Sequence, residues 1–275
     1  MRSPEAREHR YEDVTWTTGL PVSAENASQI YSRYRVAAER AVGKRVLELG
    51  CGAGQGFGLM SAQATSLIGA DYSTALLHSA RRHYGNRVPL IRLSAECLPF
   101  ADSSFDLVVF FEATYYIPDM ELAFDEISRV LTPTGAVFFA NHNPEQPGFV
   151  RSPHSHHYHS ATEFRSALED RGFTVEVEGT LPIASAAAGG RALAVSRLLA
   201  AARSVLERLH LVPKTLRGRA MLKRLVHGRL RVVPAELPDG FAPVLATVPL
   251  PTGMVRGFRA FYVFAVRGEN SGRET

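Results

Sequence analysis

The sequence predicts an α/β fold in which a mostly parallel sheet carries helices on both faces. Short apolar segments of strand length alternate along the first 180 residues with longer segments whose apolar residues recur at helical spacing, and this alternation is typical of βαβ units. A second observation is the glycine cluster Gly50, Gly52 and Gly54, which directly follows the first strand of the series. Glycines let the backbone turn sharply from strand to helix and approach a ligand without a Cβ clash.

Each element follows from its own pattern. A helix is expected over 24–42, where Ile30, Tyr34 and Ala37 recur at helical spacing and Gly43 ends the run. Parallel strands are expected at 45–50, 66–71, 88–93, 105–111 and 135–141, with helices at 73–83 and 119–131 between them. A helix at 161–171, a strand at 173–177 and a last strand at 258–266 complete the expected core.

Composition excludes several classes of protein. The chain has 275 residues, 45% of them hydrophobic and 21% charged, and a mean hydropathy of −0.06, values typical of an ordinary globular protein. No segment approaches the run of about 18 apolar residues that a membrane span needs. The first ten residues are polar, and Cys51 and Cys97 are too few for a disulfide framework. We therefore expect a cytoplasmic protein.

The positive charge is concentrated in one segment. Residues 191–231 contain eleven Lys and Arg residues and one acid, Glu207, which leaves 20 basic and 26 acidic residues elsewhere. We therefore expect three parts: an N-terminal helix and α/β core over 1–180, a basic and mostly helical cap over 181–256 inserted before the last strand, and that strand with a tail over 257–275.

The basic cap has several interpretations. It can be a lid that recognises an anionic small molecule through arginine contacts, an amphipathic surface for anionic membranes, or simply a solvated helix face. Its position between two core strands favours the lid. No aromatic and basic recognition module is visible, so we expect no nucleic-acid partner.

The residues around the glycine cluster narrow the choice of ligand. The spacing matches neither the dinucleotide fingerprint nor a Walker loop, because Gln55 and Phe57 stand where a third glycine is needed and no Gly-Lys-Ser/Thr follows. Glu48, two residues before Gly50, would repel a pyrophosphate and suits a cationic ligand. Asp71 ends the second strand, 21 residues after Gly50, where a carboxylate can accept hydrogen bonds from both ribose hydroxyls of an adenosine.

These motifs resemble the class I S-adenosylmethionine-dependent methyltransferases, in the branch that includes many small-molecule enzymes. The similarity continues through Leu98-Pro-Phe100, 104–109 and the run from Asp119 to Gly135, and it covers residues 31–180. It implies a Rossmann-like fold with a seven-stranded sheet and S-adenosylmethionine as cofactor.

The resemblance also implies roles for individual residues. Glu48, Gly50, Gly52 and Gly54 would surround the methionyl part of the cofactor, and Asp71 would hold the ribose. The adenine would lie along Ala95 and Glu96, with Tyr72 packed on the adenine or ribose and the Phe111 carbonyl facing the methionyl ammonium. Ser94 stands where the family usually has Asp, so the contact with the adenine amino group lacks a charge.

Chemistry at the acceptor needs few protein groups. Methyl transfer is an in-line displacement that depends on positioning and, for a hydroxyl acceptor, on a base. The candidates for this base are His142, after the fifth strand, and His156 and His157 in the following loop; Tyr115, Tyr116 and Tyr158 are candidate substrate-binding residues, and Glu112 lies near them in the sequence.

Two further groups of residues have open roles. The histidines of 151–160 lack a zinc-site spacing and a paired acid, so we expect no metal. Tyr31, Tyr34 and Arg35 of the first helix either close over the cofactor or pack on the sheet.

The sequence thus predicts a methyltransferase acting on a small molecule, most plausibly on a hydroxyl of a sugar-bearing or polyketide-like metabolite. A related fold can keep the cofactor for a structural purpose and act as a cyclase or a non-catalytic partner. A lipid methyltransferase at a membrane surface is a further alternative.

Overall fold

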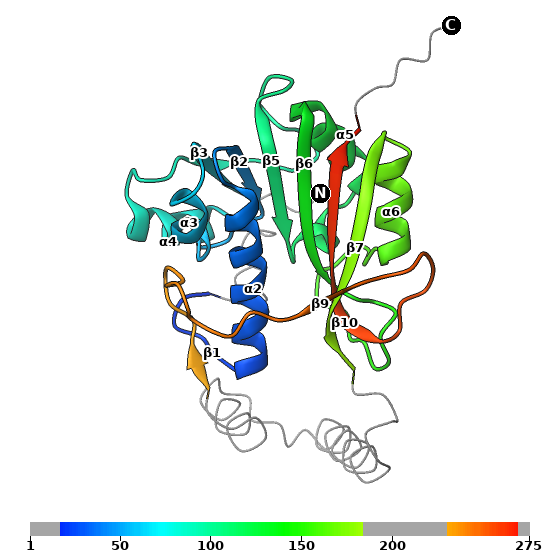
Figure 1. The fold of residues 1–275 in the computed structure, drawn as a ribbon. Helices are drawn as coiled ribbons and strands as arrows, with labels where there is room; N and C mark the ends of the chain where they lie inside the picture. The colour runs from blue at the N-terminus through cyan, green and yellow to red at the C-terminus, as the bar shows by residue number, and fades with distance from the viewer. Residues whose placement is uncertain (1–16, 184–229, 269–275) are drawn as a thin grey trace, which may run out of the picture.

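The computed structural model describes residues 17–183 and 230–268, and these form an α/β core around an eight-stranded sheet (Figure 1). The strand order is β4-β3-β2-β5-β6-β10-β7-β9. The strands are β2 Arg45–Leu49, β3 Ser66–Asp71, β4 Leu90–Arg92, β5 Phe105–Phe111, β6 Leu131–His142, β7 Phe173–Pro182, β9 Thr247–Pro249 and β10 Phe258–Arg267. The strands from β4 to β6 are parallel, and β10 lies antiparallel between β6 and β7.

The helices are α2 Ala24–Arg40, α3 Phe57–Ser61, α4 Thr74–Tyr84, α5 Met120–Val130 and α6 Ala161–Glu169, with a 3-10 turn η1 at Thr114–Tyr116. Polar side chains cap their first turns. Ser23 accepts the Asn26 N–H before α2, and Ser160 and Glu163 form a reciprocal capping box on α6.

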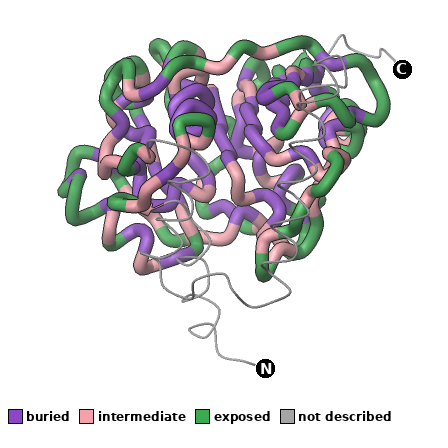
Figure 2. The backbone as a smooth tube through the Cα atoms, turned by 90° about the horizontal axis from the view of Figure 1, so that it is seen from below, coloured by how far each residue is buried: buried purple, intermediate pink, exposed green. Residues whose placement is uncertain are grey.

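The sheet is covered on both faces, as expected. Helices α2, α3 and α4 pack on one face and α5 and α6 on the other, each against a cluster of buried aliphatic and aromatic side chains. Figure 2 shows the buried backbone running through the centre, with exposed segments around it. The parallel strands are apolar because both faces are covered; β5, for example, reads Phe-Asp-Leu-Val-Val-Phe-Phe.

The described structure differs from the sequence prediction in the region before the last strand. The sheet gains an eighth strand, β9, which pairs with β7 at the edge. Residues 230–256 contain β9 and β8 Arg231–Val232, and no helix is assigned among them; β8 pairs with β1 Pro21–Val22. The rest of the predicted cap, 184–229, lies outside the described residues, so its helical character stays a prediction.

Residues 230–256 pack on the core rather than standing apart from it. Val233 and Leu237 are buried in the cluster beneath α2, and Leu250 and Val255 are buried in the cluster on the opposite face. Short irregular segments of this kind carry no hydrophobic periodicity, so the sequence pattern does not show how they pack on the core. Within the two described stretches, no helix is long and apolar enough to cross a membrane.

The sheet order places the site. The chain proceeds from β2 to β3 and β4 in one direction and returns to β5 and β6 in the other, so the order reverses between β2 and β5. Ligands of open α/β sheets bind beyond the carboxyl ends of the strands at such a reversal.

Candidate active site

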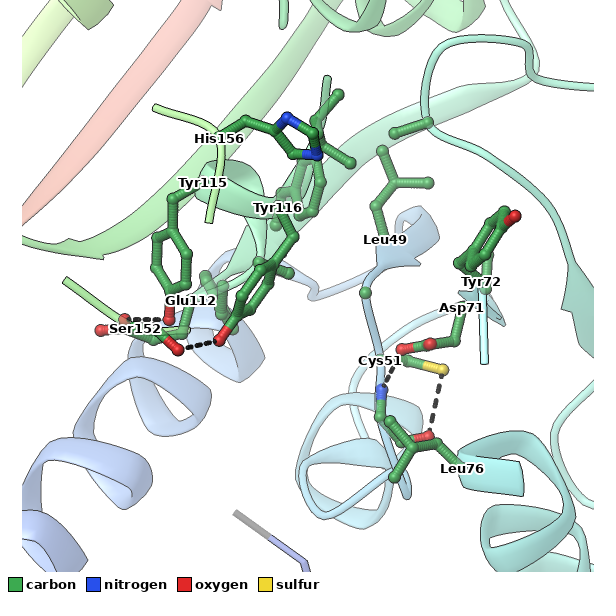
Figure 3. Close-up of a pocket in the computed structure, with 18 of the residues that line it drawn as sticks. Leu49, Cys51, Asp71, Tyr72, Leu76, Glu112, Tyr115, Tyr116, Ser152 and His156 are labelled. Carbon is green, nitrogen blue, oxygen red and sulfur yellow. Dashed lines mark hydrogen bonds between the residues drawn. The ribbon is translucent and has the colours of Figure 1, made fainter. Parts of the chain in front are cut away.

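A cavity of about 610 Å³ opens beyond the carboxyl ends of β2, β3 and β5 (Figure 3). One side is formed by the glycine loop after β2, the end of β3 and residues 93–96. The other side is formed by residues 110–118, His142 and the loop 149–158, while Arg33 and Tyr34 reach it from α2. In Figure 3, Asp71 and Tyr72 lie on one side of the cavity, and Tyr115, Tyr116 and Ser152 lie on the other.

The glycine loop holds the carboxylate of Asp71 in place. Gly50 has a φ of +62°, and a Cβ at this position would lie 2.7 Å from the Cβ of Ala113, so only glycine fits without strain. The Gly52 N–H donates to Asp71 Oδ2 at 2.7 Å and the Ser73 N–H donates to Oδ1 at 2.8 Å. Burial raises the pKa of Asp71, and these two N–H bonds oppose that rise. The carboxylate is thereby fixed at the wall of the cavity.

Glu48 lies behind the glycine loop rather than in the wall. Its side chain is fully buried, and Oε1 accepts a 2.9 Å hydrogen bond from the hydroxyl of Tyr34. Oε2 makes no hydrogen bond within the described residues. Burial raises the pKa of this carboxyl to about 8, although the Tyr34 bond and the charge of Arg33 oppose the rise. A buried acceptor of this kind favours a cationic ligand nearby.

The other side of the cavity contains a carboxylate–histidine pair. His142 Nδ1 lies 2.6 Å from Oε2 of Glu112, which also accepts a 3.2 Å bond from the Tyr115 hydroxyl. Glu112 directly follows β5 with a φ of +52°, a conformation that non-glycine residues rarely adopt. This turn brings the Glu112 carboxylate to the end of the neighbouring strand, where His142 ends β6.

The two partners shift each other's pKa. Burial by itself would raise the pKa of Glu112, but the charge and hydrogen bond of His142 and the charge of Arg33 bring it below its ordinary value. Burial would lower the pKa of His142, but the charge and hydrogen bond of Glu112 outweigh it and raise that pKa. A carboxylate that orients an imidazole through Nδ1 leaves Nε2 for proton transfer.

Aromatic rings line the mouth of the cavity beside this pair. Tyr115 and Tyr158 are stacked with centroids 4.1 Å apart, and Tyr116 meets Tyr115 edge-on at 4.6 Å. The hydroxyl of Tyr116 lies 2.6 Å from Ser152 Oγ, which ties the 149–158 loop to η1. The rings form a rigid apolar wall with polar tips, suited to holding an organic molecule.

Most of the predicted site residues meet in this cavity. Its lining includes Gly50, Gly52, Asp71, Tyr72, Ala95, Glu96, Phe111, Tyr115, Tyr116, His142, His156 and Tyr158. Three predicted residues are absent from the lining: Glu48, Gly54 and His157. Gly54 instead turns the loop towards α3, and its carbonyl accepts a bond from the Tyr84 hydroxyl.

The three histidine candidates occupy different places. His142 is paired with Glu112, whereas the His156 ring lines the cavity without a comparable carboxylate partner among the described contacts. His157 pairs with Glu163 at 2.9 Å on the outside of the loop. Within residues 17–183 and 230–268, no group of three His, Cys, Asp or Glu side chains is placed to hold a metal ion.

The first helix contributes a residue that the sequence analysis missed. Arg35 is partly exposed and pairs with Glu39 at 3.5 Å, and Tyr31 donates to Asp239. Arg33 and Tyr34 line the cavity instead. The available signal was the position of Arg33 three residues after Ile30, which places a charged side chain on the apolar face of the helix.

Ser94 lies in the cavity wall next to Ala95 and Glu96. Its hydroxyl donates to Glu96 Oε2 at 2.8 Å, and Glu96 Oε1 accepts the Asp119 N–H. The oxygen of Ser94 therefore keeps acceptor capacity towards the cavity.

Comparison with known proteins decides the family. Residues 47–139 match the family model described as a methyltransferase domain. The part of the chain from β2 to β6 is thus a methyltransferase domain. This methyltransferase domain begins inside β2, contains the glycine loop and Asp71, and ends inside β6. Strands β2 and β6 lie on either side of β5 in the sheet.

Individual relatives are similar to the core of this chain. A probable S-adenosylmethionine-dependent methyltransferase of Mycolicibacterium smegmatis is 34% identical over 154 residues, 54% of this chain and 59% of that protein. A fatty-acid O-methyltransferase of the same organism is 32% identical over 133 residues, 46% of this chain and 48% of that protein. The chain thus spans about half the length of the curated relatives it matches.

A solved structure confirms the fold over most of the chain. The crystal structure of the [4+2]-cyclase SpnF superimposes with a TM-score of 0.55 at 17% identity, covering 96% of this chain and 92% of that one. At this identity the likeness shows the shared fold alone.

Proposed function

We propose that this methyltransferase uses S-adenosylmethionine to methylate a hydroxyl of a small molecule, a sugar-bearing or polyketide-like metabolite. One observation carries the proposal. Most of the residues that match the family's cofactor motif and the Glu112–His142 pair line one cavity, so a cofactor bound on one side would face a base on the other.

The residues present fit the cofactor. The oxygens of Asp71 accept backbone N–H groups and retain lone pairs for ribose hydroxyls. The raised pKa keeps the Glu48 carboxyl mainly protonated at neutral pH, and a cationic methionyl part bound nearby would favour its ionised form. Ser94, Ala95 and Glu96 would lie along the adenine, Tyr72 would pack on the adenine or ribose, and the Phe111 carbonyl would face the methionyl ammonium.

The chain's own groups would then prepare the acceptor. The bound cofactor supplies an electrophilic methyl group on a sulfonium. His142 would accept the proton of the acceptor hydroxyl on Nε2, and Glu112 would stabilise the imidazolium that results. His156 and the stacked tyrosines would position the acceptor against this base, which is the larger part of catalysis for an in-line displacement.

The proposal also includes the charge of the acceptor and the compartment of the reaction. The basic composition of residues 191–231 favours an anionic acceptor, and we place the reaction in the cytoplasm. The match to a fatty-acid O-methyltransferase supports oxygen as the methylated atom, and the basic segment also leaves a membrane-surface lipid acceptor as a second candidate.

The test combines cofactor binding with product detection. We expect calorimetry to show micromolar binding of S-adenosylmethionine and S-adenosylhomocysteine, weakened at least tenfold in Asp71→Ala, about 1.4 kcal/mol. A panel of hydroxylated glycosides, polyketides and lipids, followed by mass spectrometry, should then show a methylated product with S-adenosylhomocysteine.

Variants of the histidines assign the base. His142→Gln should lower kcat by about 100-fold or more, the usual contribution of a general base, without changing cofactor affinity. His157→Gln, outside the cavity, is the matched control and should retain the wild-type rate. Cofactor binding without any S-adenosylhomocysteine would favour a cyclase or a non-catalytic partner, and no binding at all would refute the proposal.

A further inference from the structure

The loop 149–158 brings aromatic side chains to one side of the cavity. Tyr158 is stacked on Tyr115 with centroids 4.1 Å and planes 15° apart, and Phe149 meets Tyr158 edge-on at 4.7 Å. Together with Tyr116 these residues form a surface that we call the aromatic wall, and all four line the cavity. Phe149 and Tyr158 lie beyond residue 139, where the matched methyltransferase domain ends. The wall is therefore built partly from residues outside that domain.

The hydroxyl groups of the aromatic wall are bonded to the protein itself. The Tyr115 hydroxyl donates to Glu112 Oε2 at 3.2 Å. Ser152 engages the other two: its Oγ lies 2.6 Å from the Tyr116 hydroxyl, and its N–H donates to the Tyr158 hydroxyl at 3.2 Å. A sugar carries several hydroxyls, each of which needs a hydrogen-bond partner when it leaves water. The wall instead offers ring surface, which suits a flat apolar molecule.

The cavity lining around the aromatic wall is uncharged. Figure 3 shows Tyr115, Tyr116 and His156 on the side of the cavity away from Asp71. Within the described lining, the residues from 115–118 and 149–158 include no Asp, Glu, Lys or Arg. Besides the four aromatic residues they are Ile117, Pro118, Val150, Ser152, His154 and His156. An ionised group would lose its hydration here without gaining a counter-charge, so the part of the acceptor beside the wall is expected to be neutral.

One carboxylate oxygen joins the aromatic wall to the proposed base. Oε2 of Glu112 accepts the Tyr115 hydroxyl and also lies 2.6 Å from Nδ1 of His142. A hydroxyl on an aromatic ring lies in the plane of that ring and points beyond its edge. A ring packed flat on the wall would therefore carry its hydroxyl towards the imidazole, whereas a saturated ring is puckered and cannot lie flat.

We propose that the methyl acceptor is a phenol, with its hydroxyl on a planar aromatic ring, and that Tyr158 and Phe149 select this ring. The inference rests on the proposed function and narrows its acceptor from sugar-bearing or polyketide-like metabolites to those with a phenolic hydroxyl. A phenol also suits an imidazole base, because its pKa is about 10, as in tyrosine, and a sugar hydroxyl is a weaker acid.

The transfer then balances without a further reactant. The phenol O–H bond breaks and its proton goes to Nε2 of His142. A bond forms between the phenol oxygen and the methyl carbon, while the carbon–sulfur bond breaks with its electron pair left on sulfur. The products are an aryl methyl ether and S-adenosylhomocysteine.

Three alcohols that differ in their rings provide the test. Calorimetry would measure binding of 2-naphthol, of decahydro-2-naphthol and of methyl β-glucoside, each with and without S-adenosylhomocysteine. The first two share one carbon skeleton and one hydroxyl and differ in whether the rings are aromatic. The wild-type protein should bind 2-naphthol about fivefold or more tightly than decahydro-2-naphthol, because ring stacking adds to burial. The glucoside should bind more weakly than either.

Variants of the loop assign the preference to single rings. Tyr158→Leu should bring the affinities for the two-ring alcohols to within twofold of each other, because the stacking ring is lost. Tyr158→Phe is the matched control, since it keeps the ring and loses only the hydroxyl, and it should retain the wild-type preference within twofold. If Tyr158→Leu fails to fold, Phe149→Leu tests the same wall from a half-buried position and should also reduce the preference.

Each other outcome contradicts the inference in a distinguishable way. Equal affinity of the wild-type protein for the two-ring alcohols, or an unchanged preference in Tyr158→Leu, would mean that the wall only packs the loop. Tighter binding of the glucoside would assign a sugar acceptor. If S-adenosylhomocysteine binds and 2-naphthol does not, this inference is overturned and the proposed methyl transfer stands. If S-adenosylhomocysteine does not bind, the proposed function is overturned, and the titrations without it still show whether the wall prefers an aromatic ring.

Discussion

The hydrogen bond between His142 and Glu112 determines how the rate of the proposed methyl transfer should change with pH. A general base works in its neutral form, and Glu112 raises the pKa of His142 above its ordinary value. The rate should therefore rise with pH through a midpoint above about 6.5 and level off beyond it. The measurement is a pH–rate profile at saturating cofactor and acceptor.

Glu112→Gln tests the origin of that midpoint. The amide keeps the hydrogen bond but removes the negative charge, so burial and the charge of Arg33 then lower the pKa of His142. We expect the midpoint to move to lower pH while the plateau falls about tenfold or more, because the imidazolium loses its counter-charge. A midpoint that stays in place would show that another group limits the rate.

Single residues also show what the sequence could and could not predict. Gly50 was predictable because its positive φ favours glycine. Asp71 was predictable because a carboxylate is suited to accept hydrogen bonds at the end of β3. The partnership of Glu112 with His142 was not, because it joins the ends of two strands 30 residues apart through an unusual backbone turn. Arg33 was visible only as a charge on an apolar helix face.

Both ends of helix α5 support the side of the cavity where we propose that the adenine lies. Near its C-terminus, Arg129 donates to the carbonyls of Leu98 and Phe100 at 2.9 and 2.7 Å, and it pairs with Glu126, which accepts the Leu98 N–H. Before its N-terminus, the Asp119 N–H donates to Glu96. The helix thus holds the whole segment 96–100 against the sheet.

Arg129→Met should release this segment. Loss of the two hydrogen bonds to the Leu98 and Phe100 carbonyls should lower the free energy of unfolding by about 1–2 kcal/mol and weaken S-adenosylhomocysteine binding several-fold. Arg45→Met is the control, because Arg45 pairs with Asp106 where β2 and β5 begin, at the edge of the sheet opposite the cavity. It should lower stability by a similar or smaller amount without affecting binding, as measured by urea unfolding and calorimetry. Equal effects of both variants on affinity would show that Arg129 acts through general stability alone.

Elements whose apolar residues recur at a regular spacing were predictable from the sequence, and elements without such a spacing were not. Helices α2, α4 and α5, the strands from β2 to β6 and β10 match their expected ranges within a few residues because burial on one or both faces imposes a pattern. The five-residue helix α3 was not expected. Strand β9, three residues long with Pro249 and Pro251 beside it, has no such pattern. Its place is decided by the pairing partner that β7 offers at the sheet edge.

The fold as a whole depends on residues 230–256, which the sequence analysis assigns to the inserted cap. Leu237 is 2% exposed in the cluster beneath α2, and its N–H donates to the Gln55 carbonyl in the glycine loop at 2.8 Å. Leu237→Ala should therefore lower the free energy of unfolding by about 2–4 kcal/mol while unfolding remains a single transition, because a buried core position is lost. Val244→Ala, at an exposed position of the same segment, should change it by less than about 0.5 kcal/mol. Circular dichroism during urea unfolding measures both.

If Leu237→Ala produced an early, separate transition and left the main one in place, the segment would be an independent unit. A shift of the whole transition would show that the core and the segment fold as one.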